Sequence, residues 1–189
     1  VNKINRIPPV TRALVFLTLG IYVLQIIPGS PVTGLFAFQP ARFFSEPWRA
    51  LTAGFVHDDS LFYNPSSILH IGFNLYSLYI FGQVLEPVLG KMRFLWLYLA
   101  SIVGGSIAVL LFSDPLSVTV GASGGIFGLM ASYFVVMRAI GRNSSQIMGL
   151  IAINLVFSFL MPGISWQGHL GGLIVGAIVT YAYTKVRKR

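Results

Sequence analysis

Six apolar runs divide the chain, and polar or basic residues stand between them. A helix that crosses a bilayer needs roughly 17–25 mostly apolar residues. Within a few residues, such runs cover 10–27, 68–85, 94–112, 122–137, 147–161 and 166–183, while a proline-rich loop covers 28–67. The pattern predicts an all-α membrane protein in which six transmembrane helices form one bundle and one domain, residues 1–189.

The surroundings of two runs refine this prediction. Basic residues precede the first run, as in a signal peptide, but no A-x-A-like cleavage site follows it, so we expect a retained helix. The fourth run is too short to cross a bilayer alone. We therefore expect Ser113–Val120 to enter the membrane as non-helical backbone, which is stable there only when protein buries it or it lines a water-filled cavity.

Charge supports a membrane location and sets a direction. Charged residues make up 10% of the chain, against about 25% in soluble domains, so lipid must cover much of the surface. The net charge of +8 forms no patch with interleaved aromatics, which argues against nucleic acid as a partner. By the positive-inside rule, both termini are cytoplasmic, because eleven of the 13 Lys and Arg residues then lie inside: Lys3, Arg6, Arg12, Lys91, Arg93, Arg138, Arg142, Lys185, Arg187, Lys188 and Arg189.

Polar residues inside the predicted spans are functional candidates, because burying them in lipid is costly. They are His70, Asn74, Ser123, Asn154 and His169. Counted from the cytoplasmic edge of its own helix, each of His70, Ser123 and His169 lies fifteen or sixteen residues in. At about 1.5 Å per residue, all three lie roughly 22–24 Å above the inner edge of a core about 30 Å thick. We expect them to meet at one level, near the outer face.

Taken singly, these residues have structural explanations too. Gly121-Ala122-Ser123-Gly124-Gly125 fits the G-x-S-x-G pattern of a serine nucleophile, but also fits glycines at the small-xxx-small spacing of packed membrane helices. We expect Asn154 to hydrogen-bond a neighbouring helix and the loop residue His57 to be structural. A transporter or channel also uses intramembrane His and Asn, although the chain shows no internal repeat.

The full set of motifs resembles the rhomboid family of intramembrane serine proteases, over nearly the whole chain. The matching segments are Trp48-Arg49, His70-Ile71-Gly72-Phe73-Asn74 (H-x-x-x-N), Gly121-Ala122-Ser123-Gly124 (G-x-S-G) and His169-Leu170-Gly171-Gly172. The resemblance implies a six-helix rhomboid-like core and cleavage of membrane-anchored proteins. An inactive relative would normally lack Ser123 or His169, and both are present.

On this interpretation Ser123 is the nucleophile and His169 is the general base and then the general acid. No acidic residue lies within the spans at that depth, so we expect a dyad without an aspartate. His70 and Asn74 share one helix face, and with the backbone N–H of Ser123 they are expected to bind the oxyanion.

Supporting roles fall to Gly121, which shapes the turn, to Gly124, which allows close packing, and to Phe127. Phe127 stands where some rhomboids have a tyrosine against the catalytic imidazole, and a phenyl ring can still stack there. We expect no metal and no other cofactor. The expected partners are single-span transmembrane substrates, cut near the outer face, and the lipid bilayer. The expected location is a bacterial cell membrane, which the protein crosses several times.

Overall fold

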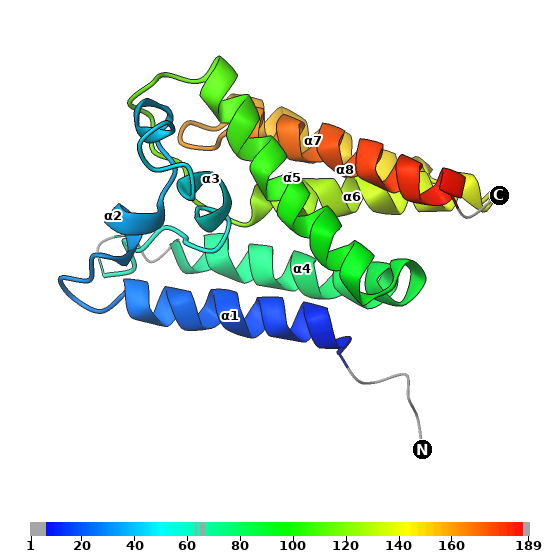
Figure 1. The fold of residues 1–189 in the computed structure, drawn as a ribbon, viewed down its shortest axis with the longest axis horizontal. Coiled ribbons are helices and arrows are strands. Elements are labelled where there is room, and N and C mark those ends of the chain that lie inside the picture. The colour runs from blue at the N-terminus through cyan, green and yellow to red at the C-terminus, as the bar shows by residue number, and fades with distance from the viewer. Residues whose placement is uncertain (1–6, 63, 65–66, 187–189) are drawn as a thin grey trace.

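The computed structural model describes residues 7–62, 64 and 67–186, and its regular elements are helices joined by loops (Figure 1). The six long helices are α1 (Pro9–Gln25), α4 (Ser67–Leu89), α5 (Lys91–Phe112), α6 (Ser123–Ala139), α7 (Ser145–Leu160) and α8 (Trp166–Val186). Each overlaps one predicted apolar run, in order. The described residues form no β-strand, so the all-α class is confirmed for them. The predicted cytoplasmic residues Lys3, Arg6, Arg187, Lys188 and Arg189 lie outside the described residues.

The helices differ in whether their length and composition suffice to cross a membrane. Among the described residues, α4 and α5 are the two helices long and apolar enough to span a bilayer, whereas α1, α6 and α7 are apolar but shorter. The six-span bundle therefore stays a prediction. Figure 1 shows that α1 begins and α8 ends at the same end of the molecule, opposite the short helices α2 (Val32–Phe36) and α3 (Arg49–Thr52).

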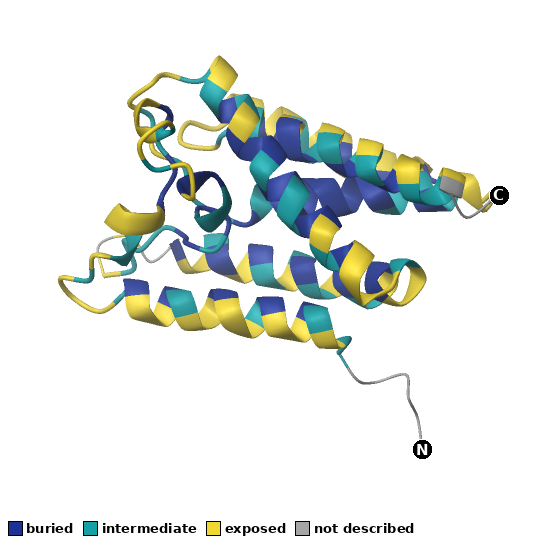
Figure 2. Ribbon diagram, viewed as in Figure 1, coloured by how far each residue is buried: buried dark blue, intermediate teal, exposed yellow. Residues whose placement is uncertain are grey.

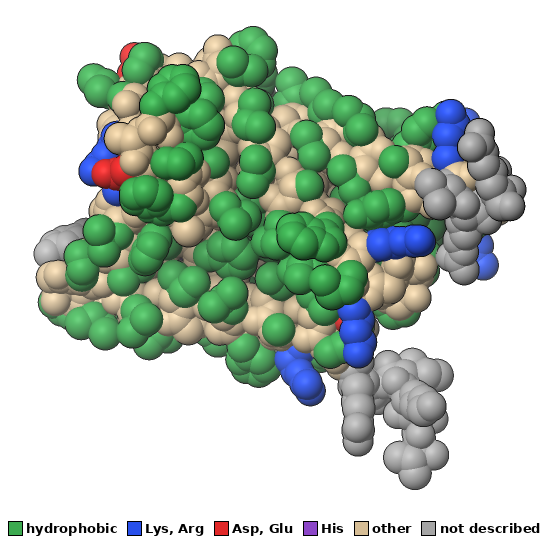
Figure 3. Space-filling model, in the orientation of Figure 1, with side chains coloured by type: hydrophobic (Ala, Val, Ile, Leu, Met, Phe, Trp, Pro, Cys, Tyr) green, Lys and Arg blue, Asp and Glu red, His purple; other side chains and the backbone are tan. Residues whose placement is uncertain are grey.

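The sides of the bundle are hydrophobic. Buried residues lie where helices face one another, and exposed residues follow their outer faces (Figure 2). Many of the exposed residues are large and apolar, such as Phe16, Phe73 and Phe159. On the face shown in Figure 3, hydrophobic side chains cover the helices, and most of the visible Lys and Arg side chains lie near the end where α1 begins and α8 ends.

Glycine allows α6 and α8 to approach at the level of their backbones. A Cβ atom at Gly172 of α8 would overlap the carbonyl oxygen of Gly124 on α6, and one at Gly176 would overlap the backbone of Gly128. α5 approaches α8 in the same way, because a Cβ at Gly171 would overlap the carbonyl oxygen of Gly104. The small-residue packing predicted from the glycine spacing is thus present, and it brings residues near Gly124 and Gly172 close together.

A buried arginine organises the long loop between α1 and α4. Arg49 is 3% exposed, and its Nη1 donates hydrogen bonds to the carbonyl oxygens of Gly34 (2.8 Å) and Ala37 (2.9 Å). Its guanidinium also forms an ion pair with Glu46. These bonds satisfy a charge that would otherwise be costly to bury, so the loop folds onto the bundle with a defined shape.

The loop in turn holds the segment that leads into α6. Residues 113–122 are non-helical, as the short fourth run predicts. Thr119 and Phe38 form an antiparallel bridge with N···O distances of 2.8 and 3.0 Å, and the backbone N–H of Gly121 donates to the carbonyl oxygen of Ala53 (2.9 Å). Protein therefore supplies backbone partners along this segment, which is the condition for non-helical backbone at membrane depth.

At the opposite end, a carboxylate from α4 caps α1. Glu86 is 3% exposed and accepts hydrogen bonds from the backbone N–H groups of Val10 (3.0 Å) and Thr11 (2.7 Å) and from the hydroxyl of Thr11 (2.8 Å). The first N–H groups of a helix have no partner within it, and a negative charge there is favoured by the helix dipole. Glu86 thereby joins the start of α1 to the end of α4.

Candidate active site

Ser123 is the first residue of α6 and follows a tight turn. The turn requires glycine at position 121, because Gly121 has φ +119° and a Cβ there would lie 2.9 Å from Nε2 of His70. The backbone N–H of Ser123 lies in the first turn of the helix, where no intrahelical carbonyl can accept it. The turn therefore presents both the hydroxyl and a backbone donor of the same residue at the positive end of a helix dipole.

His169 of α8 contacts the Ser123 hydroxyl. The distance from His169 Nε2 to Ser123 Oγ is 2.8 Å. The ring of Phe127, one turn along α6, stacks on the imidazole with centroids 4.2 Å apart and planes 14° apart. The predicted stacking of a phenyl ring at this position is therefore found. His169 is buried and Ser123 half-buried, so the pair is largely shielded from bulk solvent.

A second side chain contacts this imidazole from the opposite edge. Ser158 Oγ, on α7, lies 2.6 Å from His169 Nδ1 and also donates to the backbone carbonyl of Asn154 (2.6 Å). Ser158 is not among the candidates that the sequence predicts. The available signal was its position four residues after Asn154, which places two polar residues on one face of an apolar helix.

His70 and Asn74 line a cavity of about 800 Å³ together with Ser123 and His169. The three residues predicted to lie at one level thus share one cavity. Asn74 donates one amide hydrogen to the carbonyl oxygen of His70 in its own helix (2.7 Å). An amide nitrogen carries two hydrogens, which leaves the second for a ligand in the cavity.

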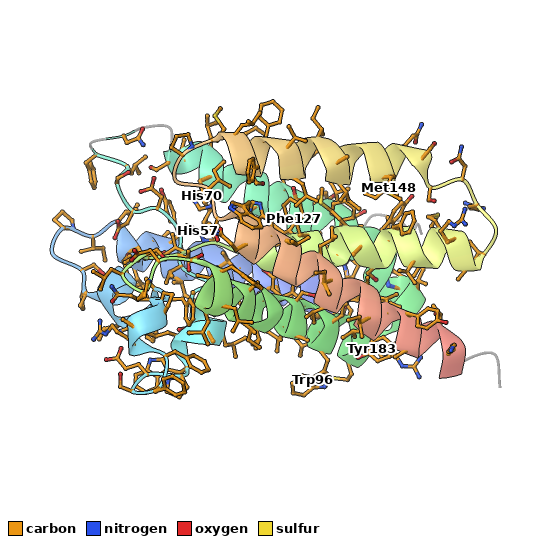
Figure 4. All side chains as sticks on the ribbon, turned by 90° about the horizontal axis from the view of Figure 1, so that it is seen from above. His57, His70, Trp96, Phe127, Met148 and Tyr183 are labelled. Carbon is orange, nitrogen blue, oxygen red and sulfur yellow. The ribbon has the colours of Figure 1, made fainter. Side chains whose placement is uncertain are left out.

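His57 forms a hydrogen bond with the turn that precedes Ser123. Its imidazole is fully buried, and its Nε2 accepts a 3.4 Å hydrogen bond from the backbone N–H of Ala122. Its ring centroid lies 5.1 Å from that of His70, and the two histidines are labelled next to each other in Figure 4. Burial lowers the pKa of His57 to about 3, and the neighbouring His70 acts on that pKa in the same direction. A neutral His57 can accept this bond, in keeping with the structural role expected for it.

Asn154 does not do what the sequence predicts. Its side-chain amide donates to the carbonyl oxygen of Leu150 in its own helix (2.8 Å), and the predicted bond to a neighbouring helix is not found among the described residues. A short polar side chain in a helix readily satisfies itself on the preceding turn. The connection between helices comes instead from Ser158, through His169.

A second, much smaller cavity lies beside the pair. It measures about 40 Å³, and its walls include Ala53, Gly54, Gly105, Ser123 and His169. A space of about 10–15 Å³ on this measure already holds one water molecule, so the cavity accommodates a few waters or a small side chain. Within the described ranges, no group of three or more Asp, Glu or His residues is placed to hold a metal ion.

Known proteins with similar sequences are rhomboid proteases, the family that the motifs resemble. Residues 45–186 match the model of the rhomboid domain. The chain is 35% identical over 150 residues to the putative rhomboid protease YdcA of Bacillus subtilis, which covers 76% of this chain and 71% of YdcA. It is 39% identical over 139 residues to the rhomboid protease GluP of the same organism, covering 69% of this chain but 25% of GluP. The match thus spans a quarter of GluP.

A more distant relative aligns over a larger share of this chain. The rhomboid protease AarA of Providencia stuartii is 24% identical over 213 aligned residues, which cover 93% of this chain and 73% of AarA. The domain match extends over most of the chain and contains Ser123, His169 and the other motif residues of the cavity. The chain therefore belongs to the rhomboid family.

Proposed function

We propose that this protein is an intramembrane serine endopeptidase that cleaves transmembrane proteins with a Ser123–His169 dyad. The observation that carries the proposal is the 2.8 Å contact between Ser123 Oγ and His169 Nε2 inside a bundle with hydrophobic sides. A hydroxyl at hydrogen-bond distance from an imidazole is the arrangement of an activated serine nucleophile. Family membership, and the protease names of the relatives, support the same reaction class.

His169 accepts and then donates a proton in each half of the reaction. His169 Nε2 takes the proton of Ser123 as Oγ bonds to the scissile carbonyl carbon, and the carbonyl oxygen becomes an oxyanion. The imidazolium then gives that proton to the amine nitrogen as the peptide C–N bond breaks, leaving an ester on Ser123. The same imidazole then deprotonates a water that attacks the ester carbonyl carbon. As the ester C–O bond breaks, the imidazolium returns the proton to Ser123 Oγ and the carboxylic acid product leaves. We propose that the backbone N–H of Ser123, His70 and the free amide hydrogen of Asn74 bind the oxyanion.

The membrane arrangement is part of the proposal. All six long helices cross the bilayer, which puts the hydrophobic outer faces against lipid and both ends of the chain in the cytoplasm. The loop end with α2 and α3 then lies outside, and the cavity containing Ser123 lies near the outer face. Residues 1–189 form a single domain, and the protein works in a bacterial cell membrane, as the bacterial relatives suggest.

The shape of the site suggests what is cut. An intact substrate helix hides its carbonyls in hydrogen bonds, so a single-span substrate must unwind locally before Ser123 can attack. Gly or Pro in that helix weakens it by about 1 or 3 kcal/mol. The 40 Å³ cavity beside the dyad favours a small residue, such as Ala, Ser or Gly, before the cut.

The dyad is tested by substitution in purified protein with a transmembrane substrate. Ser123→Ala and His169→Ala each abolish cleavage, and the double variant loses no more than either single one, because dyad members act as a unit. A serine-directed phosphonate labels wild type at Ser123 but not Ser123→Ala. Melting temperatures in detergent check that the variants fold. Substantial cleavage by either single variant contradicts the assignment.

A further inference from the structure

We propose that Ser158 is a positioning residue that holds His169 in the tautomer and orientation in which it can act as a base toward Ser123. The inference rests on the proposed function, in which His169 is that base. Ser158 lies on α7, whereas the dyad residues lie on α6 and α8. α7 thus takes part in the chemistry through the contact of Ser158 with His169.

The contact is close and enclosed. Ser158 Oγ lies 2.6 Å from His169 Nδ1, and Ser123 Oγ lies 2.8 Å from Nε2 on the other side of the same ring. Ser158 is 4% exposed and His169 is 9% exposed. Water therefore competes poorly for the Nδ1 position, and the serine hydroxyl is its partner.

The hydrogen bonds define where the protons are. A serine hydroxyl has one hydrogen and accepts through its lone pairs. Ser158 donates that hydrogen to the backbone carbonyl of Asn154 at 2.6 Å, so it can only accept from His169, and Nδ1 must carry a proton. Because the partner of one ring nitrogen fixes the state of the other, Nε2 of neutral His169 has a free lone pair directed at the Ser123 hydroxyl.

Two contacts then fix the ring completely. Stacking on Phe127, with planes 14° apart, prevents the imidazole from tilting, while a bond at Nδ1 prevents it from turning within its own plane. When Nε2 gains a proton during the reaction, the Nδ1–H bond to Ser158 persists. The neutral Ser158 hydroxyl thus orients the imidazole, which is one of the two functions of the aspartate in a Ser-His-Asp triad.

A structural alternative is that Ser158 merely bonds its own helix, as serines in helices commonly do. Ser101 on α5 offers a matched control, because it is fully buried and its hydroxyl donates to the carbonyl oxygen of Leu97 one turn earlier (2.8 Å). It faces the backbone of Gly128 on α6. Replacing it by alanine removes the same group and the same local bond.

The kinetic test compares Ser158→Ala, Ser158→Cys, Ser158→Thr and Ser101→Ala with wild type on one transmembrane substrate. Partners that orient a functional histidine from its second nitrogen typically contribute about 10- to 100-fold. We expect Ser158→Ala and the near-isosteric Ser158→Cys to lower kcat by that factor while KM stays within about twofold. Ser158→Thr restores most of the rate, and Ser101→Ala retains it. A Ser158→Ala rate near that of wild type, or an equal loss in Ser101→Ala, overturns the proposal.

A spectroscopic test does not depend on catalysis. The chain contains 3 His residues, so protein labelled with 15N-histidine gives few ring signals, and a His169→Gln difference spectrum assigns those of His169. In wild type we expect Nδ1 protonated and Nε2 unprotonated, and in Ser158→Ala a mixture of both tautomers. The same tautomer in both proteins refutes the role of Ser158.

The two proposals can also fail separately. If wild type neither cleaves nor reacts with a phosphonate at Ser123, the dyad proposal fails while the tautomer measurement still decides the role of Ser158. If wild type reacts and Ser158→Ala reacts equally fast, the dyad stands and the Ser158 proposal is wrong.

Discussion

At the residue scale, His57 couples protonation to the stability of the turn before Ser123. Its pKa is lowered to about 3, chiefly by burial, whereas an exposed histidine titrates near 6.5. Between these values the unfolded chain binds a proton that the folded chain excludes. Stability is therefore unaffected above about pH 6.5 and falls below it, by about 1.4 kcal/mol per pH unit. The titratable group that acts on this imidazole is His70, at 5.1 Å between ring centroids.

The substitution His57→Gln tests this coupling. Glutamine stays neutral and its oxygen can still accept from the N–H of Ala122. We expect the free energy of unfolding of wild type to fall by about 2 kcal/mol more than that of the variant between pH 6.5 and pH 5. Denaturant unfolding in detergent at both pH values measures the difference, because contributions from the other titratable groups are common to the two proteins and cancel. Equal pH dependence in the two proteins would mean that His57 is not the titrating group.

At the element scale, the contact between α6 and α8 controls the distance between the dyad residues. Gly124 follows Ser123, and Gly172 lies one turn after His169, so the glycines in contact adjoin the reacting groups. Gly172→Ala places a methyl group against the Gly124 carbonyl. This backbone group cannot move aside as the end of a flexible side chain could. A misplacement of about 1 Å can cost 10²-fold in rate, and overpacking typically costs about 1–3 kcal/mol.

We therefore expect Gly172→Ala to lower kcat by about 100-fold and to lower the melting temperature. The matched control is Gly20→Ala in α1, because an alanine methyl there would project into space that the described residues leave open. At that position alanine favours the helix by up to about 1 kcal/mol, so activity is kept and stability is equal or higher. If Gly172→Ala kept wild-type kinetics, α6 and α8 could move apart without loss of activity, and this prediction would be wrong.

At the scale of the whole molecule, the proposed topology is testable from outside the cell. The chain has no cysteine, so a single introduced thiol reports its own location. Asp59→Cys and Asp114→Cys lie at the loop end, and Arg142→Cys lies between α6 and α7. We expect an impermeant maleimide to label the first two on intact cells and Arg142→Cys only after permeabilisation. The reverse pattern would invert the topology.

Much of this molecule follows from local patterns. Each long helix satisfies its backbone within itself and needs only an apolar stretch of sufficient length, so the six runs locate α1 and α4 to α8 within a few residues. The equal depths of Ser123 and His169 follow from helix rise alone, and the glycine spacing indicates which faces pack. For these reasons the candidate dyad could be named from the sequence, and the structure has its members in contact.

Contacts between distant segments depend on helix rotation and register, which no local pattern specifies. The capping of α1 by Glu86 joins positions 75 and 76 residues apart. The bonds of Arg49 give shape to a loop without periodicity. Asn154 and Ser158 share one helix face, and only the rotation of α7 decides that the serine meets Nδ1 of His169 while the asparagine bonds its own helix. The helices and the residues of the candidate dyad could thus be predicted from the chain alone. Which side chain orients the imidazole could not, because that choice depends on how three helices pack.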